Sequence, residues 1–432
     1  MTGRAPRARG TTLGPRFTRL WAAFTATNLA DGLSLTAFPL LAIELTDDAR
    51  LVALVTVFRF VPFVLVGLPA GVLLDRFDRR RIAVMAQLGR GAAVAGLAVA
   101  VAADRASIAL LVVTAFAVGI GEVLTDGGLP ALVRELVGRD QLEVANGRFS
   151  ATQTVSNIFV GPPLGALLFQ LRPALPFAVS VALFVGATTL LARIPGRFRA
   201  SPNPASPNPG EPGGDERVDA SDGWLRRLVT EISVGLHYVW HHPVLRPMAF
   251  TVMAFSFVGQ ATNAVFVILV TERFGIGGLG FGLLISLQGV VAVAMSFVVA
   301  RLIGRVGHSG SMRFAVVTFT ASSLLFGFTT AVVLAALASL VKGLSDPAWN
   351  VVTNTVRQRL VPDEVFGRMM TAYLFIAWSM NPVGAFVGGL IAERWGAEWV
   401  SVMAAAVVGS LLILGRGLFR AIDEAMATEH VA

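Results

Sequence analysis

Twelve apolar runs, each long enough to cross a lipid bilayer as a helix, constrain the fold of this chain more than any other feature. A membrane-spanning helix needs roughly 20 predominantly apolar residues. Hydrophobic residues make up 55% of the sequence and charged residues only 14%, too few to cover the surface of a soluble protein. We therefore predict an all-α membrane protein with twelve transmembrane helices, at residues 18–45, 51–74, 82–103, 107–132, 146–170, 175–193, 245–271, 279–303, 312–331, 333–356, 366–392 and 398–417.

The basic residues between these runs predict the orientation of the chain. Most of the 35 Lys and Arg residues lie at the two termini and in the links that follow even-numbered runs. Because cytoplasmic loops carry the excess of Lys and Arg, both termini are expected in the cytoplasm. Lys342 is the sole lysine, a bias typical of a high-GC bacterial genome, so we expect a multi-pass protein of the bacterial cytoplasmic (inner) membrane. The net charge of +8 follows from this topology and does not indicate nucleic acid. The opposite links hold only Arg50, Arg105, Arg172, Arg273 and Arg394.

The composition changes sharply between the sixth and seventh runs. Residues 201–222 are rich in Pro, Gly, Ser and Asp, a composition that cannot bury an apolar core. An amphipathic surface helix is expected to follow, because apolar residues recur there at helical spacing, at Leu225, Leu228, Val229, Ile232, Leu236, Val239 and Trp240. The predicted organisation is an N-terminal six-helix bundle, a cytoplasmic linker with the surface helix, a C-terminal six-helix bundle and a cytoplasmic tail, at residues 1–194, 195–243, 244–420 and 421–432.

An internal repeat supports two equivalent halves. Asp126 in the first half corresponds to Asp346 in the second, and Pro162 corresponds to Pro382. The two pairs are separated by the same number of positions in the sequence. Helices 4–5 and 10–11 are therefore predicted to be copies in parallel order, as in transporters that are built from two repeated bundles.

A tight charged turn separates the second and third runs. Residues 71–81 read Gly-Val-Leu-Leu-Asp-Arg-Phe-Asp-Arg-Arg-Arg. Gly71 permits close helix packing, and the arginines favour the cytoplasmic face. The pattern G-x3-D-R-x2-R-R resembles the loop between helices 2 and 3 of major facilitator superfamily transporters. The resemblance implies the major facilitator fold of two pseudo-symmetric six-helix bundles.

Further segments resemble the macrolide and enterobactin (drug and siderophore) efflux branch of that superfamily. They are residues 28–32, 68–71, 161–165, 242–245 and 357–362. The resemblance implies a secondary active exporter. The segment Gly161-Pro162-Pro163-Leu164-Gly165 is similar to an antiporter signature that the family associates with proton-driven export. The usual Arg-x3-Gly signature in helix 4 is absent, and acids stand there instead.

Two groups of residues are candidates for gating. Gly161, Pro162 and Gly165 let helix 5 kink and pack closely on a partner helix. A carboxylate at a helix end among guanidinium groups predicts a cytoplasmic latch that forms and breaks as the halves rock. The residues of the turn and latch are Gly71, Asp75, Arg76, Arg79, Arg80 and Arg134.

Charged residues within the predicted spans are candidates for proton or substrate binding, because a charge inside a membrane needs a partner or a task. Asp31 lies in helix 1, where it either binds a proton or cation or is neutralised by Arg59 or Arg90. Glu122 and Asp126 share one face of helix 4. Two neighbouring carboxylates cannot both stay ionised cheaply, so one is expected to hold a proton unless cations or water compensate them.

Lys342 and Asp346 stand at i, i+4 on helix 10. The predicted arrangement is an intrahelical ion pair, with substrate contact as the alternative. The family resemblance implies that helices 1, 4, 7 and 10 line a central cavity, where Asp31, Glu122, Asp126, Lys342 and Asp346 would meet. The aromatic candidates for contact with a hydrophobic substrate are Phe116, Phe255, Phe266, Trp349 and Trp378.

These patterns predict a proton-coupled antiporter of small amphipathic compounds, such as antibiotics or secondary metabolites. The alternatives are a siderophore exporter or a non-transporting membrane sensor. The chain has no cysteine, and we find no phosphate-binding loop, nucleophile–base pair or zinc-ligand spacing. No enzymatic activity, metal site, cofactor or nucleic-acid partner is therefore predicted. The expected partners are the substrate, protons or sodium, and membrane lipid, and the protein is expected to be a monomer.

Overall fold

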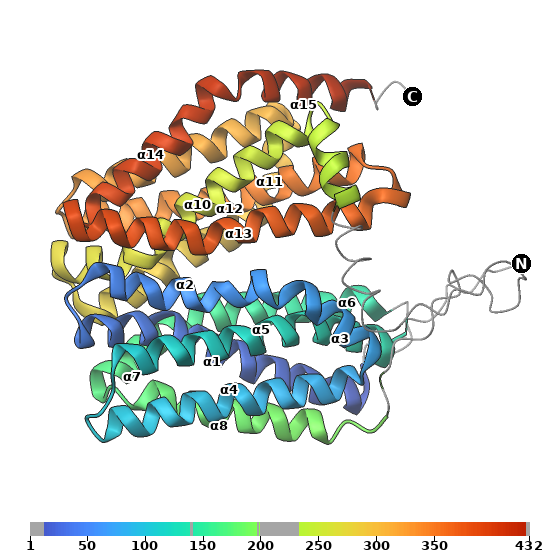
Figure 1. The fold of residues 1–432 in the computed structure, drawn as a ribbon. Coiled ribbons are helices and arrows are strands. Elements are labelled where there is room, and N and C mark those ends of the chain that lie inside the picture. The colour runs from blue at the N-terminus through green and yellow to red at the C-terminus, as the bar shows by residue number, and fades with distance from the viewer. Residues whose placement is uncertain (1–12, 139–140, 197, 199–232, 429–432) are drawn as a thin grey trace, which may run out of the picture.

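The computed structural model describes residues 13–138, 141–196, 198 and 233–428 (Figure 1). These residues form helices with short connections, and no strand occurs among them. The first half contains α1 (Gly14–Leu45), α2 (Ala49–Leu65), α3 (Gly67–Arg76), α4 (Arg79–Ala102), α5 (Ile108–Leu136), α6 (Leu142–Gln153), the π-helix η2 (Thr154–Val160), α7 (Gly161–Leu171) and α8 (Leu175–Ala192). The second half contains α10 (Leu245–Ile268), the π-helix η3 (Leu269–Arg273), α11 (Gly277–Phe328), α12 (Val332–Leu360), α13 (Asp363–Trp395), α14 (Ala397–Leu414) and α15 (Arg416–Thr428).

Ten helical segments of the described chain are long and apolar enough to cross a membrane, so the prediction of an all-α membrane protein is confirmed. The predicted span at residues 51–74 is divided between α2 and α3, which meet at Val66. Pro69 explains this interruption, because its ring clashes with the carbonyl four residues earlier and it has no N–H to donate. The predicted span at residues 279–303 and most of the one at 312–331 lie in α11, which leaves helical geometry between them at Gly307 (φ 74°). Glycine adopts this left-handed conformation at little cost.

The helices form two halves that lie one above the other in Figure 1, with the first half (blue to green) below the second (yellow-green to red). In the first half α4 packs against α5 and α8, and α1 packs against α7 and α8. In the second half α11 packs against α12 and α14, and α10 packs against α13. Contact between the halves comes mainly from α2 against α13 and from α7 and η2 against α11.

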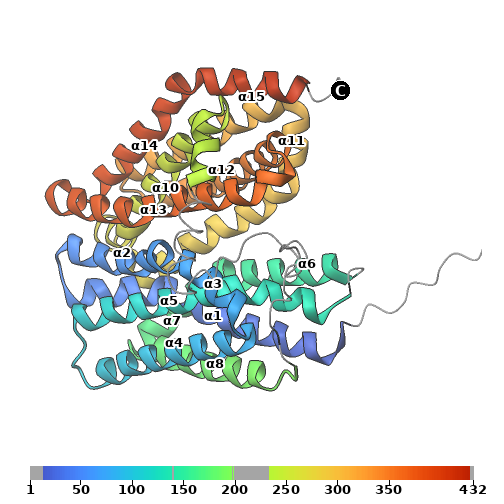
Figure 2. The same cartoon turned by 45° about the vertical axis from the view of Figure 1, so that its right-hand side comes forward.

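The buried cores show that the halves join at one end and separate at the other. One core contains residues of both halves, including Ala53 on α2 and Ala385 on α13. A second core, from Leu13 to Phe198, belongs to the first half alone, and a third belongs to the second half alone. The two separate cores contain the start of α1 and one face of α15. The halves therefore touch at the end opposite the termini, and their ribbons diverge toward the terminal end (Figure 2).

Two segments of the second half that were expected on the cytoplasmic side differ in detail from the sequence-based expectation. Residues 416–428, which include most of the expected tail, form α15. Its apolar face packs on the second-half core through Leu418, Phe419 and Ile422. Most of the predicted surface helix lies outside the described residues. Residues 233–241 are helical, and Val239 is buried in the same core as α15.

Candidate functional site

A buried ion pair joins α1 to α4 in the first half. Arg90 on α4 donates through Nη2 to the carboxylate of Asp31 on α1, and both side chains are almost fully buried. The Arg90 guanidinium also lies 4.6 Å from the ring centroid of Phe184. Gly121 of α5 makes room for Arg90, because a Cβ at Gly121 would stand 2.4 Å from the Arg90 Cγ. The sequence left Arg59 and Arg90 as alternative partners of Asp31, and the structure assigns Arg90.

A second ion pair lies beside the first. Arg59 on α2 donates from Nη2 to Oε2 of Glu122 on α5 at 3.0 Å, and both side chains are partly buried. Asp126, one helical turn beyond Glu122, is exposed and makes no hydrogen bond or ion pair with the described residues. The charges of Asp31, Glu122, Asp126, Arg59 and Arg90 are close enough to interact electrostatically. Three carboxylates and two guanidinium groups leave this charged cluster with one excess negative charge.

A neutral hydrogen bond extends the charged cluster. Gln87, fully buried on α4, donates from Nε2 to Thr27 Oγ1 on α1 at 2.6 Å. We did not predict Gln87, although a Gln within an apolar span is a sequence signal for a buried polar contact. Within the described residues, no three His, Asp or Glu side chains come together as metal ligands.

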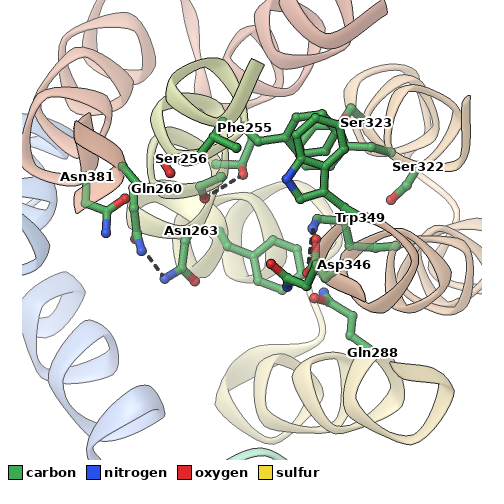
Figure 3. A pocket seen from close by; sticks show the side chains of 18 of the residues that line it. Phe255, Ser256, Gln260, Asn263, Gln288, Ser322, Ser323, Asp346, Trp349 and Asn381 are labelled. Atoms are coloured by element: carbon green, nitrogen blue, oxygen red, sulfur yellow. Dashed lines mark hydrogen bonds and ion pairs between the residues drawn. The ribbon is translucent and has the colours of Figure 1, made fainter. Parts of the chain in front are cut away.

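The second half contains a cavity of about 520 Å³, a size typical of small-molecule sites. In Figure 3 the indole of Trp349 faces Phe255, and the two rings stack with centroids 3.9 Å apart. Amide side chains form the polar wall, where Asn263 donates from Nδ2 to Oε1 of Gln260 at 3.4 Å. The cavity therefore combines aromatic surface with adaptable hydrogen-bonding groups. The amides that line it are Gln260, Asn263, Gln288, Asn350 and Asn381.

Four of the five aromatic residues singled out in the sequence line this cavity: Phe255, Phe266, Trp349 and Trp378. Phe116 instead packs against Phe58 in the first half, with ring centroids 6.2 Å apart. The amides of the polar wall were not predicted, because isolated Asn and Gln residues carry no distinctive spacing.

Lys342 and Asp346 form the predicted intrahelical ion pair and also line the cavity. Lys342 Nζ donates to both carboxylate oxygens of Asp346, at 2.9 and 3.0 Å. The same ammonium group lies 4.6 Å from the ring centroid of Phe319. The described residues that line this cavity belong to the second half. The five charged residues expected to meet therefore lie in two places, three in the charged cluster of the first half and two in the cavity of the second.

Close helix packing surrounds the predicted hinge in helix 5. The π-helix η2 ends at Val160, and α7 begins at Gly161 with Pro162 in its first turn. A Cβ at Gly161 would lie 2.4 Å from the Gly32 Cα on α1, and one at Gly165 would lie 2.6 Å from the Leu33 carbonyl oxygen. These glycines therefore allow α7 to touch α1 directly. A π-helical segment followed by proline loosens the backbone hydrogen bonding at this point.

Only part of the predicted turn and latch can be placed, because the surroundings of Gly71 and the side chains of Asp75, Arg76 and Arg134 lie outside what the structure describes. Arg79 donates from Nη1 to Oε1 of Glu135 at 3.1 Å, and Arg80 donates to the backbone carbonyl of Ile194. Asp78 caps α4 by accepting from the backbone N–H groups of Arg80 and Arg81. These contacts of Arg79 and Arg80 lie within the first half, at the end where the halves are separate.

Polar contacts join the halves at the opposite end. Glu393 of α13 accepts a hydrogen bond from the backbone N–H of Ala49 at the start of α2, with 2.9 Å between Oε2 and N. Its other carboxylate oxygen lies 3.7 Å from Arg50 Nη2. Arg50 also donates to Asp48, and these hydrogen bonds lower the pKa of the Asp48 carboxyl to about 2. The closed end of the protein therefore depends on both apolar packing and polar contacts.

Comparisons with known proteins agree with this architecture. The chain is 26% identical over 398 residues to the multidrug efflux pump Tap of Mycolicibacterium fortuitum, covering 89% of this chain and 90% of that protein. It is 22% identical over 413 residues to macrolide efflux protein A of Streptococcus pyogenes, covering 92% and 95% respectively.

A solved bacterial homologue of the human lysosomal transporter Spinster, in an inward-facing and unoccupied conformation, superimposes with a TM-score of 0.68 at 14% identity. That alignment covers 98% of this chain and 99% of the other. The sequence model described as "Major Facilitator Superfamily" matches residues 20–382. The chain therefore belongs to the Major Facilitator Superfamily.

Proposed function

We propose that this protein exports small amphipathic organic compounds from the bacterial cytoplasm in exchange for protons. The names of its relatives support efflux as the direction of transport. The single observation that carries the substrate class is the cavity of about 520 Å³, in which aromatic rings and amide groups share the lining. Such a lining accommodates molecules that have both apolar and polar faces.

Alternating access is the proposed mechanism of transport. The distribution of arginine supports cytoplasmic termini, so the end with separate cores faces the cytoplasm. The described conformation then corresponds to the inward-facing state, which receives substrate from the cytoplasm. Export requires the shared core at the other end to separate while the latch end closes, by rocking of the bundles at residues 1–194 and 244–420.

Proton coupling is assigned to the charged cluster of the first half. Its excess negative charge is costly at membrane depth, and binding of one proton removes it. Asp126 is the proposed acceptor, because it is exposed and has no cationic partner among the described residues, whereas Glu122 and Asp31 are paired. A proton that enters from outside neutralises the cluster and favours the state that faces the cytoplasm again.

Substrate-induced proton movement tests this assignment. Proteoliposomes with a trapped pH-sensitive dye receive a macrolide, a lipophilic cation or a siderophore in turn. We expect at least one class to move protons in the wild type, and Asp126→Asn to abolish proton movement while substrate binding persists. Asp104→Asn is the matched control, because Asp104 is exposed in a loop and its φ of 54° suits asparagine.

Two outcomes would contradict the proposal in different ways. Undiminished proton movement in Asp126→Asn would remove this residue from the coupling role. Substrate transport by the wild type without any proton movement would overturn proton coupling itself and leave sodium or facilitated diffusion.

A further inference from the structure

A buried guanidinium group without an acidic partner lies at one end of the second-half cavity. Arg357 on α12 is 6% exposed and lines the cavity. Its Nε donates to the Thr353 carbonyl at 3.0 Å, its Nη2 donates to the Asn354 amide oxygen, and its guanidinium lies 4.0 Å from the ring centroid of Tyr373. No carboxylate of the described chain forms an ion pair with it. A buried cation without a counter-charge is costly, so the position favours an anionic ligand.

The phenol of Tyr373 supports the same interpretation independently. Tyr373 is 2% exposed, lines the cavity, and its hydroxyl makes no hydrogen bond with the described residues. Buried hydroxyl groups are normally hydrogen-bonded. A phenolic donor beside a guanidinium group matches the requirements of a carboxylate, sulfate or phosphate oxygen.

A carboxylate lies toward the other end of the same cavity. Asp346 precedes Arg357 by three helical turns on α12, which places both side chains on nearly one face, about 16 Å apart along the helix axis. The Asp346 side chain is 56% exposed, whereas its partner Lys342 is only 17% exposed. A cationic ligand group can therefore reach Asp346, and Lys342 retains the face of the Phe319 ring as an alternative partner.

Aromatic surface lies between the two charged ends. Trp349 follows Asp346 by three residues and stacks on Phe255, and Asn350 adds a neutral polar group to the lining. Along α12 from its N-terminal side the cavity thus presents a carboxylate, then aromatic surface, then a guanidinium group.

We propose that the second-half cavity selects elongated zwitterionic compounds. The anionic group of the compound binds Arg357 and Tyr373, its cationic group binds Asp346, and its apolar middle lies against Trp349. This inference rests on the proposed export function and names the substrate class of that transporter.

Binding to the purified full-length protein in detergent tests the inference without requiring transport. The zwitterionic probe is a biphenyl with an aminomethyl group at one para end and a carboxylate at the other. Its methyl ester retains only the cation, and its N-acetyl derivative retains only the anion. Titrations follow the quenching of tryptophan fluorescence, because Trp349 and Trp378 line the cavity. We expect each singly charged probe to bind about tenfold or more weakly than the zwitterion, the range expected from loss of a charged hydrogen bond.

Variants assign each end of the probe. Arg357→Gln should remove the preference for the zwitterion over the methyl ester and leave binding of the ester unchanged. Asp346→Asn should remove the preference over the N-acetyl derivative in the same way. Tyr373→Phe keeps the ring and its packing, so it should weaken binding of both acid-bearing probes even if Arg357→Gln fails to fold. Arg359→Gln, an exposed arginine on the same helix, is the matched control and should change nothing.

Equal affinity of the wild type for the zwitterion and the ester would overturn the inference. Survival of the preference in both Arg357→Gln and Tyr373→Phe would overturn it as well. Failure of proton coupling in proteoliposomes would leave this binding preference intact, so the two proposals fail separately.

Discussion

Two adjacent glycines on α13 pack against different neighbours, one in the other half of the protein and one in the same half. Substituting each in turn separates the effect of the contact between the halves from the effect of packing within one half. A Cβ at Gly389 would lie 2.5 Å from the Ala53 Cβ and 3.2 Å from the Ala49 carbonyl oxygen, both on α2 of the other half. A Cβ at Gly388 would lie 2.5 Å from the Ala261 carbonyl oxygen, within the same half. Gly389→Ala and Gly388→Ala therefore add the same methyl group to α13, one at the interface between the halves and one against a helix of the same half.

The expected magnitude follows from the overlap. Ordinary contacts of a Cβ begin at 3.4 Å, and inserting a methyl group into a packed contact typically costs about 1–3 kcal/mol. At Gly389 the cost applies only while the halves touch at this end. The equilibrium should then shift by about 5- to 150-fold toward conformations in which this end is open. At Gly388 the overlap persists in every conformation, so stability falls without that shift.

Cysteine labelling measures the shift directly, because the chain contains no cysteine of its own. A single cysteine replaces Ala385, which is buried in the shared core one helical turn before Gly389. An impermeant maleimide is added from the side opposite the termini. We expect faster labelling in the Gly389→Ala background and no acceleration in the Gly388→Ala background. Equal labelling in both backgrounds would refute the assignment of Gly389 to the contact that holds this end closed.

Other charged contacts give further predictions. Asp31→Asn should lower the free energy of unfolding by about 3–5 kcal/mol, because it leaves Arg90 buried without a counter-charge. Adding Arg90→Met should restore much of the loss in thermal unfolding, and an additive loss would contradict the pairing. Because the pKa of Asp48 is lowered, its contribution to stability is complete above its ordinary value of 3.8 and is lost only as the pH falls toward about 2. The difference in unfolding temperature between wild type and Asp48→Asn should be small, because Arg50 is half exposed. The same difference should stay constant around neutral pH, because Asp48 remains ionised there in both the folded and the unfolded state. Glu393→Gln keeps an acceptor for the first N–H of α2, so the introduced cysteine should react with the maleimide at the wild-type rate in this background. In the Glu393→Ala background the acceptor is lost, and the same cysteine should react faster.

The helices could be predicted because apolar runs and membrane thickness determine them locally. The interruption at Val66 was missed, although Pro69 is a sequence signal for it. Gly307 lies between two predicted spans, and its left-handed backbone interrupts the helical geometry of α11 within that predicted boundary. Residues 421–428 of α15 were expected to belong to a tail, although the apolar residues of this helix recur at helical spacing, and that periodicity is a sequence signal for a buried face.

The site could be predicted less completely. The Lys342–Asp346 pair was predictable because helical spacing brings the two side chains together. The pairing of Asp31 with Arg90, and of Arg59 with Glu122, depends on contacts between helices that are distant in the sequence. The division of the charged residues between the charged cluster and the cavity depends on the same contacts, which leave no mark in local spacing.

The central claim is that a proton gradient drives substrate export, and gradient-driven accumulation tests it most directly. Proteoliposomes with an acidic lumen receive whichever macrolide, lipophilic cation or siderophore moves protons in the dye assay, in radiolabelled form. The account predicts accumulation against the substrate gradient in vesicles whose protein is oriented with the cytoplasmic side outward, and complete loss when an ionophore collapses the pH difference. Accumulation that persists without a pH difference, or that follows an imposed sodium gradient instead, would contradict it.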